Sequence, residues 1–140
     1  MKKYIGTKTV YAQPMTADEA KEKGYKIGNN TGNGYEVEYK DGYKSWSPDK
    51  AFEEAYQVAE TPLDRMEIEY KELVERFDKL HVFFAQGTNA VIEKVGVNQA
   101  ALMLWQRRSM FDYLDALGQR IQDMREKLIS EAIKHKETEQ

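Results

Sequence analysis

The chain contains no cysteine and only two histidines among its 140 residues. Without cysteine it can form no disulfide bond and offer no thiolate ligand to a metal ion. The two histidines, His81 and His135, fall at opposite ends of the helical hairpin predicted below, so they cannot share a zinc site. We therefore expect neither a metal site nor a cofactor, and the missing disulfides fit a reducing compartment.

An excess of positive charge is also missing. The chain has 21 Lys and Arg against 24 Asp and Glu, a formal net charge of -3. Nonspecific binding of DNA or RNA depends on neutralising phosphates and is therefore disfavoured, although local Lys/Arg pairs could hold a small anionic ligand.

No apolar run is long enough to cross a membrane, and the opening MKKYIGTKTV lacks the apolar stretch of a signal peptide. We expect a cytoplasmic protein that does not enter a membrane.

Catalytic signatures are absent as well. The sequence has no G-x-S-x-G elbow and no H-E-x-x-H pair. The loop IGNNTGNG resembles a phosphate-binding loop, but it lacks the lysine and the following Ser/Thr, and no helix is predicted after it. Many carboxylates stand in E-x-x-x-K pairs, which are typical of a solvated helix surface. We therefore expect no catalytic residues and no enzyme activity.

Residues 1–60 carry most of the tyrosines and glycines and predict a small sheet. In YEVEY, Tyr35, Val37 and Tyr39 alternate with glutamates, which is the period of a half-buried strand. Asp41-Gly42 suits a type I′ turn, so a hairpin is predicted from about residue 35 to 46. An earlier strand over residues 4–13 should pair with it, because two strands alone are marginally stable.

Two short helices are predicted in the same half. Thr16 and Glu19 form a capping box that begins a helix ending near Gly24. In WSPDKAFEEAYQ, Ser47 is the predicted cap and Pro48 the first helical residue of the second helix.

From Thr61 onward the sequence is helical. Thr61 is a predicted cap, Pro62 begins the first long helix, and its apolar residues recur in steps of three and four: Leu63, Met66, Tyr70, Leu73, Phe77, Leu80 and Phe84. A turn region follows, QGTNAVIEKVG, with room for a little structure of its own. A second helix over about residues 99–134 carries a matching series, Met103, Met110, Leu114, Leu117, Ile121, Met124 and Leu128. The missing member of that series is Arg107, flanked by Gln106.

Two apolar stripes of similar length, joined by a short connection, predict an antiparallel helical hairpin. The predicted fold class is therefore α+β, with a small antiparallel sheet and short helices in a head (residues 1–60) and a long two-helix hairpin (residues 61–140). The hairpin is the expected oligomerisation and ligand-binding domain. Its register brings Gln106 and Arg107 near Leu80, Phe83 and Phe84.

Arg107 and Arg108 each allow two interpretations. An arginine pair on a helix is often solvated or paired with a carboxylate, and Asp112, four residues after Arg108, supports that reading for Arg108. Arg107 would instead place a charge among apolar side chains unless an anion or carboxylate meets it. A guanidinium suits phosphate and a neighbouring phenylalanine ring suits a base, so this position resembles a nucleotide pocket.

Three aromatic residues lie outside the apolar stripes: Phe83, Trp105 and Phe111. In an isolated hairpin they would face solvent, although burying each would be worth roughly 1.5–3 kcal/mol. We expect a second subunit, the head or a ligand to cover them, and self-association is the favoured explanation. The alternative is an oligomeric adaptor that uses these residues to bind another protein.

The order of several motifs resembles the phage Thoeris anti-defence proteins of the first described type. These motifs are the opening KKYIGTKTVYAQPMT, the segment GYKSWSPDKAFEEAY, the helical TPLDRMEIEYKEL, and Q-x-x-x-M-x-x-Y-x-x-x-L-x-x-R-I over residues 106–121. The resemblance covers about residues 1–125, and its helical part is similar to a phage anti-CBASS family. It departs from the pattern in a shorter loop before GYEVEY and in an extended charged tail after Met124.

The resemblance implies a sponge that captures cyclic ADP-ribose isomers without cleaving them, within the cytoplasm of an infected bacterial host. Some such proteins also hold cyclic di- or trinucleotides, and they act as dimers or hexamers with pockets walled by more than one chain. Leu117 also fits the second-helix pattern. The ligand-binding candidates that follow from the motifs and from the hairpin register are Trp46, Arg65, Phe83, Phe84, Asn89, Gln106, Arg107, Met110, Tyr113 and Arg120.

Overall fold

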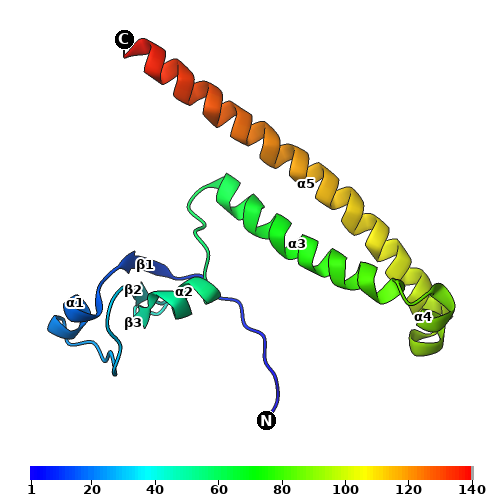
Figure 1. Cartoon of the computed structure of the whole chain (residues 1–140), viewed down its shortest axis with the longest axis horizontal. Helices are drawn as coiled ribbons and strands as arrows, with labels where there is room; N and C mark the ends of the chain where they lie inside the picture. The colour runs from blue at the N-terminus through cyan, green and yellow to red at the C-terminus, as the bar shows by residue number, and fades with distance from the viewer. Residues whose placement is uncertain (140) are drawn as a thin grey trace. The chain divides into compact units, whose positions relative to one another are not determined.

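The computed structural model describes residues 1–139, which form two compact units, residues 1–57 and residues 58–139 (Figure 1). The N-terminal unit contains a three-stranded antiparallel sheet with short helices, and the C-terminal unit contains a long helical hairpin. The predicted α+β class is therefore confirmed. Within residues 1–139, no helix is both long enough and apolar enough to cross a membrane.

The sheet has the strand order β1-β2-β3. The strands are β1 (Tyr11–Pro14), β2 (Gly34–Glu38) and β3 (Lys44–Pro48), and both neighbouring pairs are antiparallel. The central strand aligns Glu36 with Gln13 on one side and with Trp46 on the other. These three side chains therefore share one face of the sheet.

Strand β1 is shorter than the sequence pattern predicts. The alternation suggests a strand over residues 4–13, but residues 1–10 form no regular structure. The reason is the length of the partner strand: Tyr11 pairs with Glu38, the last residue of β2, so the preceding residues have no strand beside them. Alternation indicates that a segment can become a strand, but only a partner makes it one.

The β2–β3 hairpin is present, but its turn differs from the predicted type I′. Gly42 has a φ of 86°, whereas no residue other than glycine among residues 1–139 has a positive φ, so Asp41 does not adopt the required conformation. Tyr39 N–H donates to the carbonyl of Tyr43, and Gly42 N–H donates to the carbonyl of Tyr39. The result is a three-residue loop with glycine in the left-handed position, which is the next commonest hairpin connection.

Helix α1 (Ala17–Glu22) begins with the predicted capping box. Glu19 N–H donates to the Thr16 hydroxyl oxygen at 3.2 Å, and Thr16 N–H donates to the Glu19 carboxylate at 2.9 Å. Four buried residues, Met15, Ala17, Ala20 and Trp46, form the core on this side of the sheet. Gly34 lies against this core so closely that a Cβ there would overlap both the Trp46 ring and the Ser47 carbonyl oxygen.

The opposite face of the sheet packs on helix α2 (Asp49–Ala55). Tyr35 stacks on Phe52 with ring centroids 4.3 Å apart, and Val37, two residues along β2, is fully buried. The predicted start of this helix was wrong. Pro48 is extended, with ψ of 146°, and pairs with Gly34 as the last residue of β3, so the helix begins at Asp49 without a side-chain cap from Ser47.

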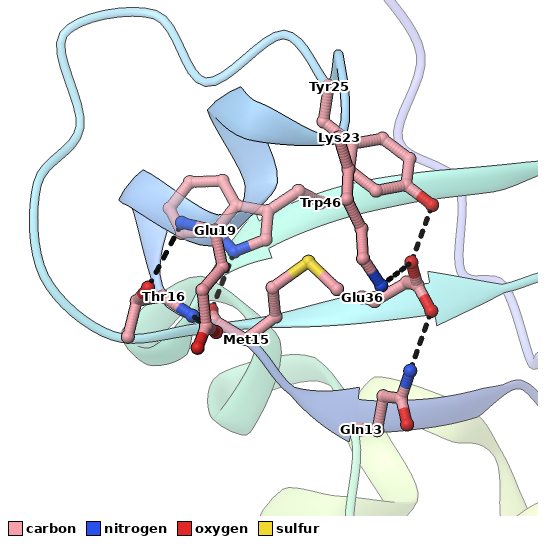
Figure 2. Close-up of polar contacts among 8 residues, drawn as sticks. All are labelled: Gln13, Met15, Thr16, Glu19, Lys23, Tyr25, Glu36 and Trp46. Atoms are coloured by element: carbon pink, nitrogen blue, oxygen red, sulfur yellow. Dashed lines mark hydrogen bonds and ion pairs between the residues drawn. The ribbon is translucent and has the colours of Figure 1, made fainter.

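Glu36 is not the solvated surface residue that the alternation suggests. Its side chain is only 12% exposed, and three polar groups converge on it (Figure 2). The Tyr25 hydroxyl donates to one carboxylate oxygen at 2.7 Å, and Gln13 Nε2 donates to the other at 2.8 Å. Lys23 Nζ lies 3.8 Å away. The hydrogen bond from Tyr25 makes the largest contribution to lowering the pKa of the Glu36 carboxyl below its usual value, and the hydrogen bond from Gln13 makes the next largest.

This lowered pKa predicts a specific acid sensitivity of the N-terminal unit. Above the ordinary glutamate pKa of about 4.3, Glu36 is ionised in both states and its contacts stabilise the fold fully. As the pH falls through the lower folded-state pKa, the unfolded chain binds the proton more readily and the stability is lost. We expect Glu36→Gln to make urea unfolding less dependent on pH below about 4.3, with the buried Trp46 as the fluorescent reporter.

The matched control for this prediction is Glu38→Gln on the same strand. The Glu38 side chain forms no hydrogen bond or ion pair with any other of residues 1–139. This variant should therefore keep the acid response of the unaltered protein. An equally steep acid response in Glu36→Gln would show that the network around Glu36 does not set it.

The C-terminal unit consists of α3 (Pro62–Phe84), α4 (Thr88–Val95) and α5 (Val97–Thr138). The predicted Thr61 cap is confirmed, with Asp64 completing a capping box. Helices α3 and α5 pack side by side as the predicted hairpin, and α4 lies at their connection (Figure 1). Gly87 and Gly96, with φ of 101° and 87°, stand at the two ends of α4 and allow the chain to turn there.

Two apolar clusters hold the hairpin together. Near the start of α3, Met66 packs with Leu117 and Ile121. At the connection, Phe84 packs with Val91 of α4 and Ala100 of α5. Between the two clusters, Phe77 of α3 lies beside Phe111 of α5, with ring centroids 6.3 Å apart. The predicted antiparallel register of α3 and α5 is therefore observed.

Candidate functional site

The candidate site lies at the connected end of the hairpin, around Phe84. Phe84, Val91 and Ala100 are buried there, and α4 closes the end of the cluster. Six further apolar side chains are partly buried against them: Leu80, Phe83, Ile92, Val95, Met103 and Leu104. The site therefore has a firm apolar floor assembled from all three helices of the unit.

Arg107 extends over this floor. Its guanidinium carbon lies 5.0 Å from the centroid of the Phe84 ring, and the residue is half-buried. The sequence predicted this proximity from the register of the two helices. No carboxylate among residues 1–139 lies within 4.0 Å of the Arg107 guanidinium. Its charge is thus held against an aromatic face without an ion-pair partner, which leaves the planar fork available to an anion.

Arg108, the next residue, has a different environment. Its Nε lies 3.5 Å from an Asp112 carboxylate oxygen one helical turn later, and its side chain is 76% exposed. The predicted surface pair of Arg108 with Asp112 is confirmed. The two neighbouring arginines therefore offer a matched comparison between a cation over an aromatic floor and a solvated one.

Phe83 does not face solvent, contrary to the prediction for an isolated hairpin. It is half-buried and meets the Phe84 ring edge-on, with centroids 6.0 Å apart. Helix α4 accounts for the difference, since it folds back over this end and packs Ile92 and Val95 against the same cluster. The turn region has more structure than a short connector would provide.

Lys94, which was not among the predicted site residues, also lies at this end. Its Nζ lies 6.0 Å from the Phe83 ring centroid and donates a hydrogen bond to Gln86 Oε1 at 2.6 Å. Gln86 in turn donates to the Phe83 carbonyl at 2.7 Å. The eight residues of α4 are too few to show a helical repeat, so the sequence carried no periodic signal that would have placed this lysine. The connected end therefore carries two cations, each close to a phenylalanine ring.

The other candidate residues fall into two groups along the hairpin. Gln106 and Asn89 are exposed near the connected end, and Met110 is half-buried one turn beyond Gln106. Arg65 and Arg120 are exposed near the opposite end. Arg107 and Arg120 are about 20 Å apart along the axis of α5, because each helical residue advances it by about 1.5 Å. One chain therefore does not bring both arginines to the same small ligand.

Tyr113 lies between these groups and is 46% exposed. Its hydroxyl donates a hydrogen bond to a carboxylate oxygen of Glu69 across the hairpin. In this arrangement the tyrosine fastens α5 to α3.

Trp46 belongs to the core of the N-terminal unit. It is 8% exposed, and its indole N–H donates to the Met15 carbonyl at 2.9 Å (Figure 2). Both the ring and its polar group are therefore already occupied within that unit. We leave Trp46 out of the site proposed below.

Residues 60–123 match the model of a protein family described as Sequestin. The match covers just under half of the chain and includes α3, α4 and α5 as far as Asp123, so Phe84, Lys94 and Arg107 all lie within it. No curated protein and no solved structure matches the chain significantly.

Proposed function

We propose that this chain binds and sequesters a small anionic signal molecule at the connected end of its helical hairpin. The family name Sequestin, matched by residues 60–123, supports a role in holding a molecule rather than converting it. The observation in the structure that carries the proposal is Arg107, whose guanidinium lies over the Phe84 ring with no carboxylate within 4.0 Å among residues 1–139.

The most specific form of the proposal is a phage anti-defence sponge. The signal would be a cyclic nucleotide of bacterial immunity, namely a cyclic ADP-ribose isomer, with cyclic di- or trinucleotides as further cargo. Holding it intact would block Thoeris or CBASS immunity. The motif order described in the sequence, together with the family match of the helical unit, supports this form.

The side chains at the connected end suit such a ligand. A pyrophosphate offers paired oxygens to the Arg107 fork, and the flat guanidinium binds them with defined geometry. Lys94 adds a second charge beside Phe83. The half-buried Phe83 ring provides a surface on which a base can stack, an interaction worth about 1–3 kcal/mol per base. Gln106, Met110 and Asn89 border the same end.

A protein that captures a signal without cleaving it can silence that signal only through high binding affinity. To silence a signal the protein must bind it more tightly than the host effector does, and each tenfold gain costs about 1.4 kcal/mol of binding free energy. A preformed apolar floor helps because few side chains must be ordered upon binding.

We propose that a second copy of the chain completes the pocket. Trp105 is 70% exposed and Phe111 is 55% exposed, so large apolar surfaces remain uncovered beside Gln106 and Arg107. Arg65 and Arg120, remote from Arg107 within one chain, could reach the ligand only from another copy. A dimer or a hexamer would satisfy this requirement.

The proposal predicts the recovery of intact ligand. Purified protein is incubated with cyclic ADP-ribose isomers, freed of unbound ligand by gel filtration, and heated to denature it. We expect the supernatant to contain unmodified ligand in a fixed ratio to protein, as measured by liquid chromatography and mass spectrometry. A linear or hydrolysed product would contradict sequestration and indicate a hydrolase.

The alternative function is an oligomeric adaptor of a phage, and the exposure of Trp105 and Phe111 favours it. Large exposed apolar side chains are as suitable for a partner protein as for a second copy. The same heating experiment separates the two functions, since an adaptor would release no nucleotide from any of the offered signals.

A further inference from the structure

The last part of α5 extends beyond α3, and among residues 58–139 no other helix lies beside it (Figure 1). The final cross-hairpin contacts are those of Leu63 and Met124 with the Ile121 cluster and the ion pair of Arg125 with Glu67 at 2.7 Å. Helix α5 nevertheless continues to Thr138. Ile129 and Ile133 in this extension are 60% and 52% exposed. We call residues 126–138 the α5 extension.

Four residues of the α5 extension form one stripe. Glu126, Ile129, Ile133 and Lys136 follow each other in steps of three, four and three, which places them on a single face of the helix. The stripe has an isoleucine pair in its middle and opposite charges at its ends. Glu126 and Lys136 form no ion pair with any other of residues 1–139. By contrast, the nearby Lys127 is neutralised by Asp123 at 2.9 Å within its own helix.

The charges and isoleucines of this stripe are complementary to those of a second copy that runs in the opposite direction. In two antiparallel copies related by a twofold axis at the level of Glu131, position 129 of one helix faces position 133 of the other. Position 126 then faces position 136, so Glu126 meets Lys136 of the second copy at both ends of the contact. Glu131 itself lies on the opposite side of the helix and does not interfere. A parallel pairing in register would instead place like charges together.

From this complementarity we propose that the α5 extension binds the α5 extension of a second copy in an antiparallel arrangement. The contact lies outside the family match, which ends at residue 123, and it does not depend on the ligand proposed above. Isoleucine side chains give the contact its apolar centre, and the charges select the antiparallel register. Two hairpins joined in this way would carry their connected ends on opposite sides of the contact.

Introduced cysteines test the register, because the chain has none of its own. One full-length variant carries Ile129→Cys and another carries Ile133→Cys. We expect an equimolar mixture to form disulfide-linked dimers at least tenfold faster under mild oxidation than either variant alone, since only unlike positions face each other. Equal rates in the mixture and in the separate variants, or no cross-linking at all, would overturn the proposal.

Charge reversal tests the same contact without altering its apolar centre. Adding Lys136→Glu to the Ile133→Cys chain should slow cross-linking in the mixture by about fivefold, because it opposes Glu126 with a second carboxylate. Adding Glu126→Lys to the Ile129→Cys chain should then restore the rate. Lys134→Glu, on the other side of the helix, is the control and should leave it unchanged. If Lys134→Glu and Lys136→Glu slow the reaction equally, the charges act through overall repulsion and the proposed contact is wrong.

Discussion

Replacing Arg107 by alanine is expected to weaken the capture of cyclic ADP-ribose isomers by at least tenfold while the fold stays intact. The reason is the position of the guanidinium, 5.0 Å from the Phe84 ring centroid and without an ion-pair partner among residues 1–139. Removal of a fork that binds phosphate oxygens costs about 1.5–3 kcal/mol per charged hydrogen bond. Isothermal titration calorimetry of the unaltered and variant proteins measures the effect directly.

Arg108→Ala is the matched control for this experiment. It removes the same side chain from the next residue of the same helix, but Arg108 is 76% exposed and already paired with Asp112. We expect its affinity to stay within about twofold of the unaltered protein, because exposed ion pairs are worth little. Equal losses in the two variants would mean that nonspecific attraction of the anion, and not the site at Phe84, drives binding.

A lysine at position 107 separates charge from shape. Arg107→Lys keeps the positive charge but loses the planar fork and its stacking on the ring. An affinity between those of arginine and alanine is expected if the fork binds phosphate oxygens in pairs. Unchanged affinity in Arg107→Ala, measured with correctly folded protein, would remove Arg107 from the site altogether.

Helical periodicity carried most of the information about the C-terminal unit. The steps of three and four that end at Phe84, and those that resume at Met103, determine which faces of α3 and α5 meet. Antiparallel packing then sets the register and so the proximity of Arg107 to Phe84. Periodicity could not predict helix α4, because eight residues are too few to show a helical repeat. The position of Lys94 and the burial of Phe83 depend on that helix and were therefore missed.

The N-terminal unit was harder to predict because pairing decides the structure of strands. Residues 4–10 alternate as well as β2 does, yet β2 ends at Glu38 and offers them no partner. Pro48 suits the first turn of a helix, but pairing with Gly34 keeps it in β3, at an edge of the sheet where a missing N–H is tolerated. Alternation in the sequence predicts that a strand has two faces, but it does not predict which side chains cover each face. For that reason the burial of Glu36 could not be predicted.

Leu117→Ala is expected to produce the largest loss of stability in the C-terminal unit, about 3 kcal/mol. Leu117 is 2% exposed and packs with Met66 and Ile121 in the cluster that joins the two long helices. Its truncation leaves a cavity between α3 and α5, where packing is already close: a Cβ added to the neighbouring Gly118 would lie only 3.4 Å from the Tyr70 ring. Urea unfolding followed by the helical circular dichroism signal measures the change.

Leu128→Ala provides the comparison, because it falls on the same apolar stripe but beyond the start of α3. Leu128 is 52% exposed, so the same truncation should cost under about 0.5 kcal/mol at low micromolar protein concentration. A similar loss in both variants would contradict the assignment of the hairpin core to the Leu117 cluster.

Leu117 also lies about 15 Å from Arg107 along α5. Ligand affinity measured well below the melting temperature should therefore survive Leu117→Ala, whereas Arg107→Ala should lose affinity and keep its stability. This opposite pattern in the two variants separates the residues that hold the hairpin together from those that hold its cargo.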